Sequence, residues 1–498
     1  MENGYLAKSS VFYPHLAVYR QGGVNMIVGR DHEIAELKAA MISDCSEFIA
    51  VYGRRRIGKT FLVRETFQYH FAFQHAGVFK GSKAEQLYAF SASLKDAGLT
   101  SWKKLDNWLQ AFEQLKDLLR SQPAGKKVVF IDELSWMDTP KSDLMKALEH
   151  FWNSWASARQ DIVLIICTSV TSWMIRKIIH NKGGLYHRLT HRIFLQPFSL
   201  HQCEEYANSQ GLGFSRNQLL EAYMILGGVP FYWTFLKKEY SFAQNIDLLF
   251  FSRNAELKDE FDHLFASLFK SPQDYIQIVT ALAHHSQGMT RGEILKDTGL
   301  TGSGRFSEKL LDLENCGFIR SFDPFKNRKK ETIYQLTDSF TIFYYHFLEN
   351  RPRDIHFWTN QLNTPRINTW NGLAFERVCL LHTDQIRAAL GISGMLTTTS
   401  SWICKADSEK GIQGSQIDLV LSRNDHVINL LEMKYSDKPY AITKAGWEDL
   451  IRKKNDFLLA TETKSAVHLT MVTPWGVVPN QYAKEIQSLV TIDHLFAP

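Results

Sequence analysis

The feature of this sequence that most constrains its fold is an apolar run that leads directly into a glycine-rich loop. Residues 47–52 read Glu-Phe-Ile-Ala-Val-Tyr, and residues 53–60 read Gly-Arg-Arg-Arg-Ile-Gly-Lys-Thr. A strand, a Gly-x-x-x-x-Gly-Lys-Thr loop and a helix, here expected over residues 60–67, form the context that phosphate binding requires. The sequence therefore predicts a phosphate-binding loop in an α/β protein.

Each position of this loop has a chemical role. Gly53 and Gly58 let the backbone curl so that successive N–H groups point into one concavity, and the helix N-terminus adds its positive end. Lys59 can reach the β- and γ-phosphates, and the Thr60 hydroxyl can ligate Mg²⁺. We therefore expect ATP and Mg²⁺ as cofactors. The residues expected to contact the nucleotide are Gly53, Arg54, Arg55, Arg56, Ile57, Gly58, Lys59, Thr60 and Phe61.

The three arginines inside the loop are expected to have no catalytic role. A phosphate-binding loop works through its backbone, so the side chains of Arg54, Arg55 and Arg56 are free to point outward or to touch a neighbouring subunit. They can also raise the local positive potential for ATP.

A second element completes the predicted nucleotide site. Residues 126–133 read Lys-Lys-Val-Val-Phe-Ile-Asp-Glu, an apolar run typical of a buried parallel strand that ends in two carboxylates. Asp132 is placed to hold Mg²⁺ through water, and Glu133 to act as general base on the attacking water. An exposed acidic cap explains either motif alone, but not their order along the chain. We predict a nucleoside triphosphatase.

Strand-like and helix-like segments alternate from residue 26 to residue 199. Apolar runs occur at residues 48–52, 70–78, 128–131, 162–168 and 192–195. This alternation predicts a parallel sheet with helices on both faces. From residue 200 to residue 269 the pattern is purely helical, which predicts a separate helical subdomain.

Composition agrees with a large globular protein of about three to four domains. The net charge of +5 permits contact with nucleic acid without requiring it. The six cysteines show no spacing typical of a zinc site. The N-terminus lacks a signal-peptide pattern, and no apolar run approaches the ~18 residues of a membrane span. We expect a cytoplasmic protein without a membrane segment.

Residues 270–350 show a different pattern. Three expected helices, at residues 275–285, 290–298 and 305–316, precede two strands joined by a basic hairpin at residues 326–330. This order is the outline of a winged helix. The hairpin is basic enough to touch a nucleic-acid backbone, although such a charge run also fits a solvated loop.

The last part of the chain carries a second set of chemical residues. Asp418 and Glu432 lie on two consecutive predicted strands, and Lys434 follows Glu432 on the same face of its strand. Glu376 lies on a helix that precedes both strands. The carboxylates Glu376, Asp418 and Glu432 can bind Mg²⁺, and Lys434 can stabilise charge on a phosphate.

With these residues together, the chain resembles the archaeal-type ATPase family within the AAA+/STAND group of P-loop NTPases, fused to a C-terminal PD-(D/E)xK nuclease-like domain. The resemblance identifies residues 53–60 and 130–133 as Walker A and Walker B motifs. It implies that residues 28–33 pack near the adenine. Thr168 and Ser169 fall where the family carries a polar sensor, although they also fit a simple helix cap.

The resemblance also implies roles for two later segments. Gly-Gly-Val-Pro at residues 227–230 is similar to a motif whose proline, here Pro230, rests on the nucleotide base; a plain turn between helices is the alternative. Arg188 is a candidate arginine finger or sensor, and Arg192 competes for that role. A surface arginine without such a duty fits equally well.

The resemblance further implies that Glu376, Asp418, Glu432 and Lys434 form a nuclease site; a vestigial fold that pairs these groups with one another is the alternative. The expected fold class is α/β, with an extension (1–25), a P-loop core (26–199), a helical subdomain (200–269), a winged helix (270–350) and a mixed α/β nuclease-like domain (351–498). We expect an ATP-controlled switch over a nuclease acting on DNA, with a homo-oligomer as a candidate assembly. The alternative is a regulator without nuclease activity that only docks partners.

Overall fold

A computed structural model of the chain describes residues 27–101, 103–269, 271–325, 332–350, 352–409 and 411–498. It also describes the backbone of a short antiparallel pair, β1 (Arg20–Gln21) and β2 (Val24–Asn25). The rest of the predicted N-terminal extension and the basic hairpin at residues 326–330 lie outside the described residues.

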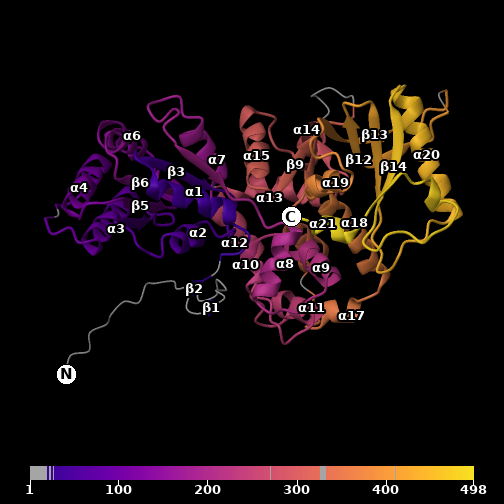
Figure 1. The fold of residues 1–498 in the computed structure, drawn as a ribbon, viewed down its shortest axis with the longest axis horizontal. Helices are drawn as coiled ribbons and strands as arrows, with labels where there is room; N and C mark the ends of the chain where they lie inside the picture. The colour runs from indigo at the N-terminus through magenta and orange to yellow at the C-terminus, as the bar shows by residue number, and fades with distance from the viewer. Residues whose placement is uncertain are drawn as a thin grey trace.

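The N-terminal lobe is built on a five-stranded parallel sheet (Figure 1). Its order is β4-β5-β6-β3-β7, and every neighbouring pair runs parallel. Apolar side chains fill both faces of the central strands, as expected for a sheet that helices cover on both sides. The strands are β3 (Glu47–Tyr52), β4 (Phe73–Ala76), β5 (Lys127–Asp132), β6 (Ile162–Thr168) and β7 (His191–Phe194).

Alternate residues of each central strand enter two separate cores. Ile49 and Val51 of β3 pack with α1 (Asp31–Ile42) and α2 (Lys59–Thr66), whereas Phe48 and Ala50 belong to the core on the opposite face. The helices of that second core are α3 (Lys83–Asp96), α4 (Trp108–Ser121) and α6 (Leu144–Ser154). Two short helices, α5 (Leu134–Met137) and α7 (Thr171–Met174), follow β5 and β6. The predicted parallel-sheet core with helices on both faces is confirmed.

A helical unit follows β7. Capping boxes fix three of its helix starts, where Ser199, Ser215 and Ser241 each exchange hydrogen bonds with a glutamine three residues later. Pro230 stands in the first turn of α10, where a missing N–H costs nothing. The helices are α8 (Leu200–Ser209), α9 (Arg216–Leu226), α10 (Pro230–Trp233), α11 (Phe242–Ile246) and α12 (Glu260–Leu268).

A helix–hairpin unit comes next, where a winged helix is predicted. Its helices are α13 (Pro272–Ala283), α14 (Arg291–Thr298) and α15 (Gly304–Asn315). Its small antiparallel sheet has the order β8-β10-β9, with β8 (Met289–Thr290), β9 (Ile319–Phe322) and β10 (Ile333–Leu336). Strand β8 has no counterpart in the sequence prediction. Helix α16 (Ser339–Phe343) leads out of the unit.

The C-terminal part is a mixed five-stranded sheet in the order β11-β12-β13-β14-β15. The first two pairs are antiparallel and the last two are parallel. Helix α20 packs on one face and α18 on the other. The elements are α17 (Phe357–Gln361), α18 (Pro365–Leu381), α19 (Thr383–Ala389), β11 (Thr397–Cys404), β12 (Ser415–Arg423), β13 (Val427–Met433), α20 (Lys444–Thr461), β14 (Ala466–Val472), β15 (Ser488–Val490) and α21 (Ile492–Leu495).

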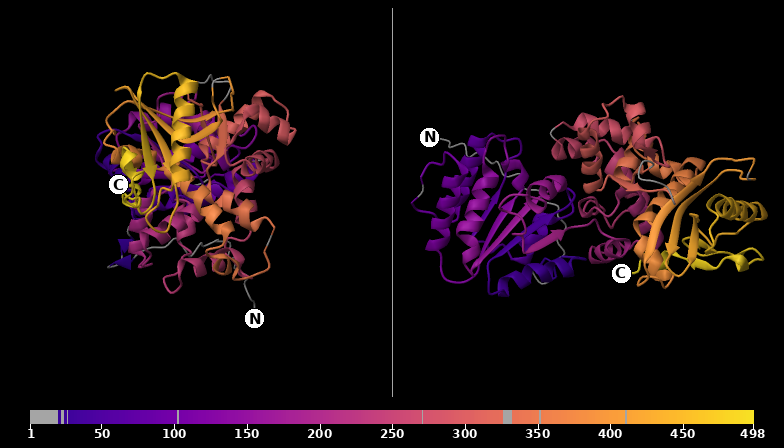
Figure 2. Two further views of the ribbon diagram at one scale, coloured as in Figure 1. Left: turned by 90° about the vertical axis from the view of Figure 1, so that its right-hand side faces the viewer. Right: turned by 90° about the horizontal axis from the view of Figure 1, so that it is seen from above.

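The molecule has an elongated shape, with the parallel sheet at one end and the C-terminal sheet at the other (Figure 2). One continuous buried core runs from Phe198 to Phe496 and includes the helical unit, the helix–hairpin unit and one face of the C-terminal sheet. The predicted boundaries at residues 269 and 350 therefore lie inside a shared core. None of the described helices combines the length and the apolar character that crossing a membrane requires.

Candidate functional site

The phosphate-binding loop joins β3 to α2 at the carboxyl edge of the parallel sheet. Gly53 has a φ of +143°, and a Cβ atom there would lie 2.4 Å from the carbonyl oxygen of Leu195. Gly58 caps α2 with a φ of +88°. These backbone positions require glycine, which explains the spacing of the motif.

Lys59 lies inside the curl of the loop. Its buried Nζ donates hydrogen bonds to the carbonyl oxygens of Gly53, at 3.0 Å, and Arg54, at 2.7 Å. Phosphate oxygens carry more negative charge than these carbonyls, so they are the stronger acceptors for the ammonium group. The position suits a lysine that contacts the phosphates of a nucleotide.

Replacing Lys59 with alanine is expected to weaken ATP binding by roughly 10- to 100-fold, since hydrogen bonds to charged groups are worth about 1.5–3 kcal/mol. Titration with a fluorescent ATP analogue measures the change, and thermal melting checks the fold. Lys38→Ala, on the outer surface of α1, is the matched control. Equal ATP affinity in a folded Lys59→Ala protein would contradict the role of Lys59.

Two oxygen ligands for a cation meet beside the loop. The Thr60 hydroxyl donates a 2.7 Å hydrogen bond to the Asp132 carboxylate, although the two residues are 72 positions apart. Hydroxyl and carboxylate oxygens are the donors that Mg²⁺ prefers. The residues present therefore fit a magnesium ion, and Thr60 and Asp132 are the groups that would hold it.

Glu133 stands at the same edge of the sheet, in a left-handed backbone conformation with a φ of +47°. Its carboxylate accepts hydrogen bonds from the Ser169 hydroxyl, at 2.6 Å, and from the Ser169 N–H, at 3.1 Å. Burial and the neighbouring charge of Asp132 raise its pKa. A carboxylate with a raised pKa is a stronger proton acceptor, as a general base needs.

The two candidate sensor residues have different contacts. Thr168 accepts the N–H of Val170 and donates to Ser135, so its hydroxyl holds the start of α7. Ser169 instead holds the Glu133 carboxylate. The position next to the expected base therefore belongs to Ser169.

A small apolar cavity of about 50 Å³ adjoins the loop, where a nucleotide base is expected. Pro230, predicted to rest on the base, lines this cavity together with Val28 of the predicted entry segment and Phe61 of α2. Tyr206 and Gln210, near the end of α8, also line it and were not predicted. Neither belongs to a recognisable motif, so only the fold identifies them.

Of the alternatives for the loop arginines, an outward-pointing side chain does not apply to Arg54 and Arg56, which pair with acids inside the chain. Arg54 is 6% exposed and its Nη1 lies 2.5 Å from the Asp338 carboxylate, at the start of α16. Burial alone would lower the pKa of Arg54, but Asp338 outweighs it and the pKa is raised. Arg56 forms an ion pair with the buried Glu260 of α12. The physical reason is that buried acids 204 to 284 positions away lie against the loop.

Arg188 lies at the opposite edge of the parallel sheet from the loop. It is exposed and lies just before β7. The first residues of β7 pair with the first half of β3, and Thr190 donates its N–H to the carbonyl oxygen of Phe48 there. Arg192, at the start of β7, is also exposed. The structure brings neither arginine to the nucleotide site of its own chain. A finger role for Arg188 therefore stays a prediction that requires a second subunit.

The C-terminal carboxylates lie on neighbouring strands. The last paired residues of β12 and β13 are Leu419 and Leu431, so Asp418 and Glu432 face each other one step further along. Strand β12 begins at Ser415, so Asp418 lies within the strand. Lys434 follows β13, and its Nζ lies 2.8 Å from Glu432.

Glu432 is more tightly paired than predicted. Lys453 of α20 donates hydrogen bonds to both of its carboxylate oxygens, at 3.0 and 2.9 Å. Together with Lys434, it gives this buried carboxylate two cationic partners. Lys453 was not predicted because it lies on a helix whose contact with β13 is not encoded in a local motif.

Among the described residues, no lysine or arginine lies within 4 Å of the carboxylates of Asp418 and Glu376, although the charges of Lys434 and Lys453 act on them from further away. Burial and the charge of Glu432 raise the pKa of Asp418, and the Gln416 amide donates to Asp418 at 2.8 Å. Burial and the charge of Asp418 raise the pKa of Glu376 to about 7. A cation between these carboxylates would relieve their repulsion.

The carboxylate oxygens of this site are suitable ligands for Mg²⁺, but they are not gathered around one point. Among the described residues, no group of three or more acidic, histidine or cysteine side chains is close enough to hold a metal ion. Glu376 and Asp418 are the residues that would hold Mg²⁺, and Glu432 would join them only by leaving Lys453. The predicted three-carboxylate metal site is thus not preformed.

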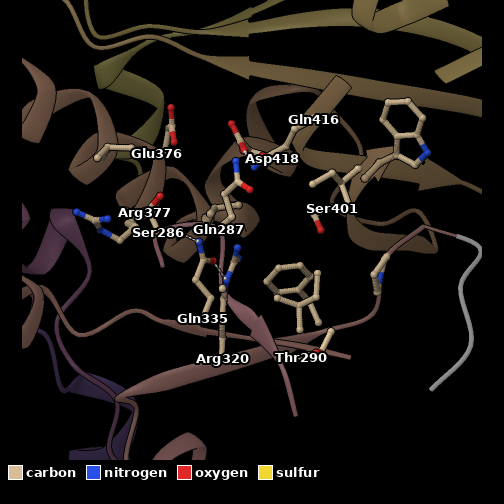
Figure 3. A pocket seen from close by; sticks show the side chains of 18 of the residues that line it. Ser286, Gln287, Thr290, Arg320, Gln335, Glu376, Arg377, Ser401, Gln416 and Asp418 are labelled. Carbon is tan, nitrogen blue, oxygen red and sulfur yellow. Dashed lines mark hydrogen bonds between the residues drawn. The ribbon is translucent and has the colours of Figure 1, made fainter. Parts of the chain in front are cut away.

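All four predicted residues of this site line one pocket of about 700 Å³. The pocket lies between the C-terminal sheet and the helix–hairpin unit (Figure 3). Arg320 and Gln335 point into it from the three-stranded sheet, toward Asp418. No motif in the sequence indicates that the two units face each other here.

The loop, the strand-end carboxylates and the parallel sheet define a P-loop ATPase. Residues 27–234 match the model of a family described as an ATPase domain predominantly from Archaea. This match supports an archaeal-type P-loop ATPase and confirms that part of the predicted resemblance. Beyond the matched residues, the winged-helix and nuclease-like assignments stay predictions.

Individual relatives are distant. An uncharacterized protein of Methanocaldococcus jannaschii is 23% identical over 444 residues, which is 86% of this chain and 92% of that protein. The Walker-type ATPase of Pyrococcus abyssi is similar with a TM-score of 0.45 and 17% identity, over 64% of this chain and 95% of its own. The ORC2 protein of Aeropyrum pernix, in ADPNP–ADP complexes, is similar with a TM-score of 0.41 and 12% identity. This similarity covers 70% of this chain and 99% of that protein. Scores this low carry no argument about function.

Proposed function

We propose that this protein is an ATP-controlled switch in which the P-loop ATPase governs a metal-dependent nuclease-like site in the C-terminal sheet. The nucleotide half of this proposal is supported by the convergence of Lys59, Thr60, Asp132 and Glu133 at one sheet edge. ATP and Mg²⁺ are the cofactors. DNA is the substrate class that the C-terminal residues suit.

Control of the C-terminal site by nucleotide is supported by two ion pairs between the phosphate-binding loop and the second half of the molecule. Arg54 pairs with Asp338, and Arg56 pairs with Glu260. The Arg54 guanidinium also lies 5.0 Å from the ring centroid of Phe318, the residue that precedes β9. Any shift of the loop on phosphate binding therefore acts directly on α12, on α16 and on the helix–hairpin unit.

A second contact runs beside the base cavity. The carbonyl oxygen of Arg56 accepts the N–H of Phe231 in α10, at 3.4 Å, and the Arg56 guanidinium lies 4.3 Å from the Phe231 ring centroid. Glu260 accepts a 2.8 Å hydrogen bond from Tyr232 of the same helix. Helix α10, which carries Pro230, thus contacts the phosphate-binding loop at several points. The base, beside Pro230, and the phosphates, in the loop, therefore contact parts of the chain that are linked to each other.

At the effector site, the chain supplies two distinct functions. Glu376 and Asp418 would hold a divalent cation, which supplies polarisation of a phosphodiester and a more acidic bound water. Lys434 lies at the same pocket, where its ammonium can stabilise charge that develops on the phosphate. Burial would lower the pKa of Lys434, but contact with Glu432 outweighs it and the pKa is raised, so the amine stays charged.

One observation favours the alternative of a docking module without nuclease activity. Glu432 is neutralised by Lys434 and Lys453, as expected if the polar groups of a vestigial site pair with one another. Incubation of the purified protein with single-stranded and duplex DNA, with Mg²⁺ or Mn²⁺ and ATP, separates the two. Cleavage supports the switch, whereas stable binding without cleavage supports the docking module.

Asp338→Asn tests the bridge between the lobes. Removing one partner of a buried ion pair leaves the other charge uncompensated and costs about 3–5 kcal/mol. We expect a clear loss of thermal stability together with a changed ATP affinity. Asp274 pairs with Lys309 and its side chain is 43% exposed, so Asp274→Asn is the matched control and should have little effect. Equal melting of the Asp338→Asn and Asp274→Asn proteins would contradict the bridge.

A further inference from the structure

The pocket that holds the candidate nuclease residues has two walls that come from different units. Three carboxylates of α18, β12 and β13, with Arg377, Lys434 and Lys453 beside them, form one wall, and the three-stranded sheet of the helix–hairpin unit forms most of the other. On this second wall Arg320 of β9 points toward Asp418 (Figure 3). The second wall therefore presents a cation to whatever enters.

Arg320 is held firmly in this position. Its Nε donates a 2.9 Å hydrogen bond to Gln335 of β10, and Gln335 in turn donates to the carbonyl oxygen of Ser286 at 2.6 Å. The guanidinium also lies 4.8 Å from the centroid of the Phe322 ring. These contacts use one edge of the guanidinium and leave its two terminal nitrogens for another partner.

Within the described part of the chain, no carboxylate lies within 4 Å of Arg320, in contrast to Arg54 and Arg56. Burial lowers the pKa of Arg320 to about 10, and the charge of Asp418 only partly opposes this effect. Arg377 of α18 lines the same pocket, and its buried Nη2 has no hydrogen-bond partner among the described residues. Half-buried arginines without acidic partners are suited to bind an anion.

The size of the pocket limits the form of that anion. Its volume of about 700 Å³ lies within the ~300–1,000 Å³ typical of pockets that enclose a small molecule. A space of this size, partly open to the surface between the two walls, can hold one or two nucleotides of a single strand and is small beside a paired duplex. A pocket of this size therefore favours a single strand over a duplex.

We propose that Arg320 binds a backbone phosphate of a single nucleic-acid strand and holds it against Asp418 and Glu376, so that the substrate of this site is single-stranded and not duplex. This inference rests on the proposed function of the C-terminal site and adds its substrate class. Arg320 is then a substrate-binding residue supplied by a different unit from the one that carries the carboxylates.

Binding of a short fluorescein-labelled oligothymidylate, measured by fluorescence anisotropy in EDTA, tests the inference without relying on cleavage. Arg320→Gln should weaken binding by roughly 10- to 100-fold, the range for hydrogen bonds to a charged group, and should reduce the salt dependence by about one phosphate contact. Arg320→Lys should recover part of the affinity, because it keeps the charge. Arg305→Gln, which removes an exposed charge from α15 of the same unit, should bind as the wild type does.

Three results would overturn the inference. They are unchanged binding by folded Arg320→Gln protein, equal weakening by Arg305→Gln, and competition by a blunt duplex as strong as by the single strand. Normal ATP hydrolysis and melting identify variants that remain folded, and Arg320→Lys keeps the test open if Arg320→Gln does not fold. A wild type that binds the single strand but cleaves nothing with Mg²⁺ or Mn²⁺ would refute the proposed nuclease and leave the single-strand site supported.

Discussion

Glu133→Gln is expected to slow ATP hydrolysis by about 10²–10⁴-fold while ATP binding persists, the range for loss of a general base. The amide keeps the size of the side chain but cannot accept a proton from water. It also keeps one of the two acceptor oxygens that Ser169 uses, so one of the two hydrogen bonds to Ser169 should survive. Phosphate release measures turnover, and fluorescent-nucleotide titration measures binding.

Glu149→Gln is the matched control, since Glu149 lies on α6 away from the loop. Hydrolysis by Glu133→Gln at the wild-type rate would show that another group activates the water. Loss of ATP binding together with turnover would show that Glu133 holds the site together and is not the base.

The second large effect concerns the C-terminal site. Asp418→Ala is expected to abolish metal-dependent cleavage of DNA, because of the three predicted metal carboxylates only Glu376 would then remain without a lysine partner. Lys434→Ala should slow cleavage by about 10²–10³-fold, by analogy with the loss of one oxyanion donor. Gel assays with labelled single-stranded DNA measure both, and ATP hydrolysis by the same proteins should stay near the wild-type rate.

Lys438→Ala provides the control for Lys434, because it removes an exposed lysine from the loop that follows the same strand. Unchanged cleavage in both Asp418→Ala and Lys434→Ala would place the chemistry elsewhere. Glu432→Gln distinguishes further: if Glu432 serves only as the partner of Lys434 and Lys453, the amide should disturb stability more than cleavage.

Much of the fold follows from local pattern. The apolar run at residues 162–168 predicted β6 to the residue, and the runs at 48–52 and 128–131 predicted β3 and β5 within one residue at each end. Period-two alternation correctly placed Glu432 and Lys434 on one face, as their 2.8 Å contact shows. Glycine positions in the phosphate-binding loop were equally predictable, because their backbone angles exclude other residues.

What could not be predicted is the contact between distant parts of the chain. Nothing near Arg54 indicates that Asp338, 284 positions away, will neutralise it. The same holds for Lys453 beside Glu432 and for Arg320 opposite Asp418. These side chains lie on different elements, and their meeting depends on how whole units pack through the shared core that runs from Phe198 to Phe496.

The edge of the sheet at which Arg188 lies could not be predicted from its position in the sequence either. The resemblance implies a finger or sensor role for Arg188 and so places it at a nucleotide site. A parallel strand, however, begins at the edge opposite to its carboxyl end, and the loop stands at that carboxyl end. The order of residues along the chain gave no warning of this separation.

We propose that nucleotide at the P-loop controls the C-terminal site. The rate of Mg²⁺-dependent single-strand cleavage by the full chain, measured with ATP, with ADP and without nucleotide in wild type and in Lys59→Ala, tests this control. Coupling between sites is typically about 1–3 kcal/mol, so ATP should change the wild-type rate by about 5- to 150-fold and leave the Lys59→Ala rate unchanged. A wild-type rate that is the same with and without ATP would contradict the claim.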